Sequence, residues 1–195
     1  MGKKIHLEKI ENLFEKSPVV NFSSIKKIIR SNKKKSNYAG VLISNLLKKG
    51  KIKKIGKGIY TKNNEISLGV FAFAPSYLGL QSAVSYWGLW EQETIPIILT
   101  TKNVRRGIRK IMGANVLVRK INKKYFFGFN LEKEENFYLP YSDIEKTFID
   151  LVVFKEKLSS QIIEKFKENI NHKKLLNYLK KYPLHTRNFI LKKLK

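Results

Sequence analysis

Amide, hydroxyl and lysine side chains gather between residues 30 and 57 of this chain, in a pattern that could bind nucleic acid. Asn37, Ser44 and Asn45 are of the kinds that hydrogen-bond to base edges. The lysines, with the Tyr38 hydroxyl, suit phosphate oxygens or a minor groove. The candidate DNA-binding residues are Arg30, Lys33, Lys34, Lys35, Ser36, Asn37, Tyr38, Ser44, Asn45, Lys48, Lys53, Lys54 and Lys57.

A helix over residues 36–49 would carry the base-reading side chains. Five apolar residues recur there at helical spacing: Ala39, Leu42, Ile43, Leu46 and Leu47. They define one buried face, and the polar candidates lie opposite. Gly50 follows, where a left-handed cap would end the helix. Two β-prone runs, 52–55 and 59–60, then flank Gly56-Lys57-Gly58 and predict a tight basic hairpin.

Two more helices are expected before this one. Residues 5–16 have helical apolar spacing and end at Ser17-Pro18, because the residue before proline avoids the α region. Ser23 can cap a second helix containing Ile25 and Ile29. Two helices, a basic turn, a third helix and a hairpin make the winged variant of the helix-turn-helix, whose third helix usually enters the major groove. The sequence therefore predicts a winged helix-turn-helix DNA-binding domain over residues 1–62.

The charge distribution supports a polyanionic partner. The chain has 195 residues and a net charge of +25. Residues 1–62 carry net +14, residues 63–154 net +2 and residues 155–195 net +9, so the excess is concentrated at the two ends. Double-stranded DNA is the expected partner, as an operator with possible inverted repeats bound by a homodimer.

Several other classes of protein are disfavoured by composition. The absence of cysteine excludes disulfides and thiolate zinc sites. No apolar run approaches the ~20 residues that span a bilayer, and no signal-peptide core is present. We expect a cytoplasmic protein with no membrane partner and no cofactor.

A second domain is expected over residues 66–195, after the polar break at residues 62–65. Pro75-Ser76 is expected to open a helix that ends at Gly88. Strands are predicted at residues 95–101, 115–121, 125–129 and 137–139. A helix begins at Ser142, and three helical segments follow from Ser159. The fold class is α+β, with a small, mainly antiparallel sheet and C-terminal helices.

Two alternatives to a DNA-binding regulator remain. A metal-dependent nucleic-acid enzyme would need clustered carboxylates, and Asp143, Glu145 and Asp150 are the best candidates. Acids in the first turn of a helix, however, also complement its dipole, and Glu145 and Asp150 are about 140° apart around a helix. We therefore expect no catalytic residue and no bound metal. An RNA- or ribosome-associated interaction module would use the same positive charge.

Three motifs, in order, resemble the AbiEi antitoxins of type IV toxin-antitoxin systems. After the winged helix come Ser82-Ala83-Val84 with Trp87-Gly88-Leu89, then Pro96 before an apolar strand, then Glu145-Lys146-Thr147-Phe148-Ile149-Asp150. Trp87 stands where many members have histidine, and Phe148 where leucine is usual. The resemblance implies a repressor of its own operon whose C-terminal domain counters a nucleotidyltransferase toxin.

Overall fold

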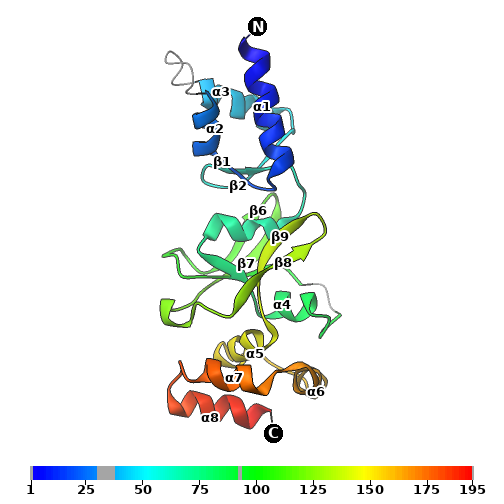
Figure 1. Ribbon diagram of the computed structural model, residues 1–195, viewed down its shortest axis with the longest axis vertical. Coiled ribbons are helices and arrows are strands. Elements are labelled where there is room, and N and C mark those ends of the chain that lie inside the picture. Colours follow the sequence, from blue (N-terminus) through cyan, green and yellow to red (C-terminus); the bar gives the residue numbers. More distant parts are fainter. Residues whose placement is uncertain (1, 30–37, 92–93, 195) are drawn as a thin grey trace. The chain divides into compact units, whose positions relative to one another are not determined.

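The computed structural model describes residues 2–29, 38–91 and 94–194, and the chain divides into two compact units (Figure 1). The first unit comprises Met1–Ala72 with Lys110–Ala114, and the second comprises Phe73–Arg109 with Asn115–Lys195. The chain is mixed α+β, as predicted. None of the described helices is long and apolar enough to cross a membrane.

Three helices pack together in the first unit: α1 (Gly2–Lys16), α2 (Phe22–Ile29) and α3 (Tyr38–Lys48). Their shared core contains Ile10, Phe14, Ile25, Ile29, Ala39, Ile43 and Leu46. Gly50 ends α3 in the left-handed region, with φ 67°, and its N–H donates to the Leu47 carbonyl at 3.0 Å. The Lys51 N–H donates to the Leu46 carbonyl at 2.9 Å. The predicted glycine cap is therefore confirmed.

A three-stranded sheet completes this arrangement. Its strands are β1 (Val20–Asn21), β2 (Lys53–Gly56) and β3 (Ile59–Thr61), in the order β1-β3-β2. Both pairs are antiparallel, and the β2–β3 register shifts between Lys54 and Gly56. The basic hairpin predicted from Gly56-Lys57-Gly58 is confirmed, whereas β1 was not predicted. The two residues of β1 are too few to show a strand pattern.

A 3-10 helix, η1 (Ile66–Phe73), adds to the first unit beyond the expected boundary. Leu68 and Val70 are fully buried. Gly56 of β2 lies so close to Ala72 that a Cβ on the glycine would be 2.8 Å from the alanine Cβ. The division between units therefore falls after Ala72, not within residues 63–65.

The second sheet has six strands in the order β6-β7-β5-β4-β9-β8. They are β4 (Ser76–Leu78), β5 (Ile97–Thr100), β6 (Gly107–Ile111), β7 (Ala114–Lys120), β8 (Phe129–Glu134) and β9 (Phe137–Ser142). The pairs β4–β5 and β8–β9 are antiparallel, whereas β4–β9 and β5–β7 are parallel.

Five helices and a short 3-10 turn accompany this sheet. They are α4 (Gln81–Tyr86), η2 (Lys123–Tyr125), α5 (Ile144–Val153), α6 (Ser160–Asn169), α7 (His172–Leu179) and α8 (Leu184–Lys193). Eight consecutive residues of α5, Glu145 to Val152, are buried, and Figure 1 shows α5 between the strands and the helices α7 and α8. Helix α5 is thus the centre of the second core.

Three local predictions in the second domain were wrong. Residues 76–78 form the strand β4 and not the start of a helix, which is limited to Gln81–Tyr86. The strand predicted at residues 125–129 was wrong, because residues 123–125 form η2 and β8 begins only at Phe129. The cap of α5 is Asp143 rather than Ser142, with its carboxylate accepting from the Lys146 N–H at 2.8 Å. In the first domain, α2 begins at Phe22, so Ser23 lies inside that helix and does not cap it.

Candidate nucleic-acid interface

The side of α3 that faces away from the core is exposed and polar. Ser44, Asn45 and Lys48 are exposed on it, and Val41 keeps 55% of its surface in contact with solvent. These side chains lie on one face because Ala39, Ile43 and Leu46 turn the opposite face into the core. Gly40 contributes no side chain to the exposed face, and apart from its own helix backbone no atom of the described residues lies within 4 Å of where its Cβ would be. The surface offers hydrogen-bonding groups, one apolar contact and room for close approach.

The β2–β3 hairpin adds positive charge next to this helix in the chain. Lys54 and Lys57 are exposed, and Gly58, with φ 70°, closes the turn beside Lys57. The alternation of the strand accounts for Lys54, because its neighbour Ile55 points inward with 4% exposure. The hairpin therefore presents ammonium groups to solvent on a short, fixed backbone.

The acids of the first unit lie outside the stretch of chain that carries these lysines: three are on α1, and Glu65 accepts from the Ser67 N–H at 3.0 Å. No aspartate or glutamate occurs between residues 16 and 64, and the acids of residues 1–62 are Glu8, Glu11 and Glu15, all on α1. Two of them hold lysines outside the candidate face, since Lys51 pairs with Glu11 at 3.2 Å and Lys62 with Glu15 at 3.6 Å.

In the part of the chain that the structure describes, no carboxylate pairs with Lys48, Lys54 or Lys57. Their charge is available to an external anion.

The remaining predicted site residues have different placements. The Lys53 ammonium donates to the Asn64 side-chain oxygen, and Lys53 is only partly exposed. Tyr38 is also half-buried and packs against the helical core, with its ring 6.4 Å from that of His6. Arg30, Lys33, Lys34, Lys35, Ser36 and Asn37 lie outside the described residues. Of the predicted set, Ser44, Asn45, Lys48, Lys54 and Lys57 are thus exposed in the first unit.

The carboxylates considered for metal chemistry already have protein partners. Asp150 is fully buried, accepts a hydrogen bond from the Tyr77 hydroxyl at 2.6 Å and pairs with the buried Lys146 ammonium. Asp143 and Glu145 share the Lys174 ammonium, at 3.2 Å and 2.8 Å. The Lys146 ammonium also lies over the rings of Tyr77 and Phe127, at 5.7 Å and 5.2 Å from their centroids.

Burial controls the acid-base behaviour of this network. Removal from water raises the pKa of Asp150 and lowers that of Lys146, and their contact with each other opposes both shifts. Burial and the hydrogen bond to Asp143, at 2.7 Å, raise the pKa of Tyr178 to about 12. Burial alone would lower the pKa of Lys174, but Glu145 and Asp143 outweigh it and raise the value. These groups stabilise one another's charges, as a structural network does.

Sequence reasoning missed this network. The spacing of Lys146 and Asp150, four residues apart on a strongly apolar helix, was a usable signal, because that spacing places the two side chains on one helix face. The third member, Tyr77, lies 73 residues earlier, and only the packing of β4 against α5 brings it near.

Comparison with known proteins identifies a shared fold. The chain is similar to the crystal structure of the RV2827C protein from Mycobacterium tuberculosis, with a TM-score of 0.61 over 92% of this chain and 72% of that chain. The two sequences are 12% identical, so the likeness concerns the fold alone. No protein-family model and no curated protein matches the chain.

Proposed function

We propose that this chain is a DNA-binding transcriptional regulator and that residues 1–62 act as a winged helix-turn-helix. The observation that carries the proposal is the exposed Val41, Ser44, Asn45 and Lys48 face of α3, followed by a hairpin whose Lys54 and Lys57 have no acidic partner among the described residues. In proteins of this class the third helix lies in the major groove. The element order from α1 to β3 fits that geometry.

Each exposed side chain has a role in this proposal. Ser44 and Asn45 read base edges, and Val41 contacts a thymine methyl group. Lys48, Lys54 and Lys57 bind phosphates and set the position of the helix in the groove. The positive end of the chain, net +9 over residues 155–195, adds attraction to DNA that does not depend on sequence. A homodimer on an inverted repeat would place two α3 helices on successive turns of the duplex.

The salt dependence of binding tests the hairpin's part directly. Lys54→Ala and Lys57→Ala should each weaken binding to any duplex and reduce the slope of log K against log salt by about 0.9, because each removes one phosphate contact. Fluorescence anisotropy at several salt concentrations gives the slope.

The control is Lys62→Ala. Because Lys62 is already paired with Glu15, its replacement should leave the slope unchanged. Equal slopes for all three variants would remove the hairpin from the interface. Tighter binding to duplex RNA than to duplex DNA would favour the RNA- or ribosome-associated alternative. Side chains cannot read the deep, narrow major groove of RNA, so this result would contradict the base-reading role of α3.

We further propose that the second unit acts as a type IV antitoxin, on the strength of the AbiEi-like motifs at residues 82–101 and 144–152. The proposal includes no enzymatic step, because Asp143, Glu145 and Asp150 are held by lysine and tyrosine partners.

Co-expression with a neighbouring nucleotidyltransferase toxin separates the two activities. The full chain carrying Ser44→Ala, Lys54→Ala and Lys57→Ala should lose repression of its own promoter but still protect cells, since all three changes lie in the first unit. Growth and a promoter reporter are measured together. Loss of protection at normal protein level, in parallel with loss of repression, would contradict the division of labour.

A further inference from the structure

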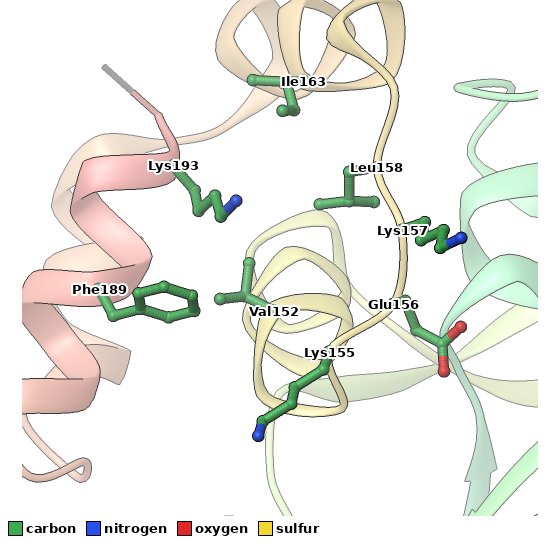
Figure 2. A pocket seen from close by; sticks show the side chains of 8 residues that line it. All are labelled: Val152, Lys155, Glu156, Lys157, Leu158, Ile163, Phe189 and Lys193. Atoms are coloured by element: carbon green, nitrogen blue, oxygen red, sulfur yellow. The ribbon is translucent and has the colours of Figure 1, made fainter.

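A pocket of about 570 Å³ lies in the second unit, between the end of α5, the linker that follows it, α6 and α8 (Figure 2). Its apolar wall consists of Val152, Leu158, Ile163 and Phe189. Its volume is in the range of about 300 to 1,000 Å³ that small-molecule sites usually have. None of the lining residues belongs to the α3 face or to the β2–β3 hairpin.

The charged residues around this pocket are unbalanced. Lys155, Lys157 and Lys193 line it, and within the described part of the chain no carboxylate forms an ion pair with any of them. In Figure 2 the Lys193 side chain extends toward the space between α8 and α6, and its ammonium lies 5.7 Å from the centre of the Phe189 ring. Figure 2 shows the Lys193 ammonium beside the apolar wall, whereas the Lys155 and Lys157 side chains extend away from Leu158 and Ile163.

The single acid in the lining does not offset this charge. One oxygen of Glu156 accepts from the Arg119 guanidinium at 2.7 Å, and the other accepts from the Gln81 amide at 3.0 Å. Figure 2 shows the Glu156 carboxylate on the outer side of the linker, away from Val152 and Phe189. Both oxygens are thus engaged outside the pocket, and among the residues that the structure describes no other acid lines it.

The backbone holds one of these lysines at a position that favours glycine. Lys155 has φ 59°, and it occupies the left-handed residue of the turn that ends α5. The turn is closed by the Lys155 N–H donating to Val152 and the Glu156 N–H donating to Leu151, at 3.1 Å and 2.9 Å. Strain of this kind is concentrated at functional sites. A lysine where glycine would fit more easily keeps a charge at the pocket.

We propose that this pocket binds a small amphipathic organic anion, with its apolar body against Val152, Leu158, Ile163 and Phe189. Its carboxylate pairs with Lys193 and with the exposed Lys155 side chain, which turns toward it from the direction seen in Figure 2. The apolar wall supplies most of the affinity through burial, and the lysines select an acid over a neutral molecule. Helix dipoles offer another explanation for the lysines, because Lys155 follows the end of α5 and Lys193 ends α8. A matched pair of lysines separates the two explanations.

Titration of the full chain with decanoate, below its critical micelle concentration, is the test. Calorimetry should give saturable one-site binding, with decanol and acetate at least tenfold weaker, because decanol lacks the charge and acetate the apolar body. In nitrogen-15 NMR the amides of Leu158 and Ile163 should shift during the titration.

The double variant Lys155→Gln/Lys193→Gln should weaken decanoate binding about tenfold, from two ion pairs at the solvent boundary. The control is Lys180→Gln/Lys192→Gln, which removes the same charge from the end of α7 and the last turn of α8 without touching the pocket lining. Equal losses in the two double variants would assign the lysines to helix dipoles and overturn the proposal.

Failure to saturate, or equal affinity for decanoate and decanol, would overturn it as well. An acidic apolar peptide that binds when decanoate does not would assign the pocket to a partner protein, which also rejects a small-molecule site.

Discussion

Replacing Asp150 by alanine is expected to lower the free energy of unfolding by about 3 to 5 kcal/mol, the cost of leaving a buried charge without its partner. Lys146 has no exposed surface, and Asp150 is its carboxylate partner. The aromatic rings of Tyr77 and Phe127 beside the ammonium cannot replace a carboxylate in energy. Urea denaturation followed by circular dichroism gives the change.

The double variant Lys146→Met/Asp150→Leu provides the decisive comparison. It removes both charges while keeping the approximate volume, so it should be more stable than Asp150→Ala. Lys174→Ala should cost about 1 kcal/mol or less, because the Lys174 side chain is 40% exposed and its ion pairs are screened by water. A loss for Lys174→Ala as large as that for Asp150→Ala would show that burial does not control the strength of this network.

Ser44→Ala and Asn45→Ala are each expected to cost about 1 to 3 kcal/mol on the operator and little on random DNA, because base contacts provide specificity and phosphate contacts provide general affinity. The promoter region of the chain's own gene is the first operator to test. Affinities should be compared at one salt concentration, since the phosphate contribution changes steeply with salt.

Asn12→Ala is the matched control for Asn45→Ala. Asn12 is also an exposed asparagine on a helix of the first unit, but it lies on α1, beside the acids Glu8, Glu11 and Glu15. The control should bind both DNAs as well as the unsubstituted chain does. Equal losses for Asn45→Ala on operator and random DNA would mean that α3 positions the backbone without reading bases.

Local signals predicted the parts of the fold that local chemistry decides. The end of α3 at Gly50 and the hairpin around Gly58 follow from residues that adopt positive φ without steric cost, so neighbouring residues were enough. The exposed face of α3 was also predicted, because Ile43 and Leu46 set the direction of every other side chain on that helix.

Features decided by distant residues were missed. All three residues of β4 are buried between β5 and β9, so no alternation distinguishes this strand from a buried helix. Burial alternates along strand β6, but one of the exposed positions is the apolar Ile108, at 64% exposure. The sequence of this segment is therefore typical of a basic loop. The Lys53 contact with Asn64 likewise depends on how the chain returns after β3, which removed one predicted phosphate ligand from the exposed set.

The chain crosses the boundary between the two units more than once, and this limits how recombination can change the gene that encodes it. The polypeptide passes from one unit to the other after Ala72, after Arg109 and after Ala114. Neither unit is therefore encoded by one uninterrupted stretch of codons, and a single recombination breakpoint cannot exchange the first unit whole. A crossover after codon 72 would replace residues 1–72 but leave segment 110–114 from the original gene. Ile111 of that segment would still have to fit against the residue at position 69, which is glycine in this chain. If α3 reads an operator as proposed, a new operator specificity is more readily acquired by point substitutions on α3 than by exchange of domains between genes.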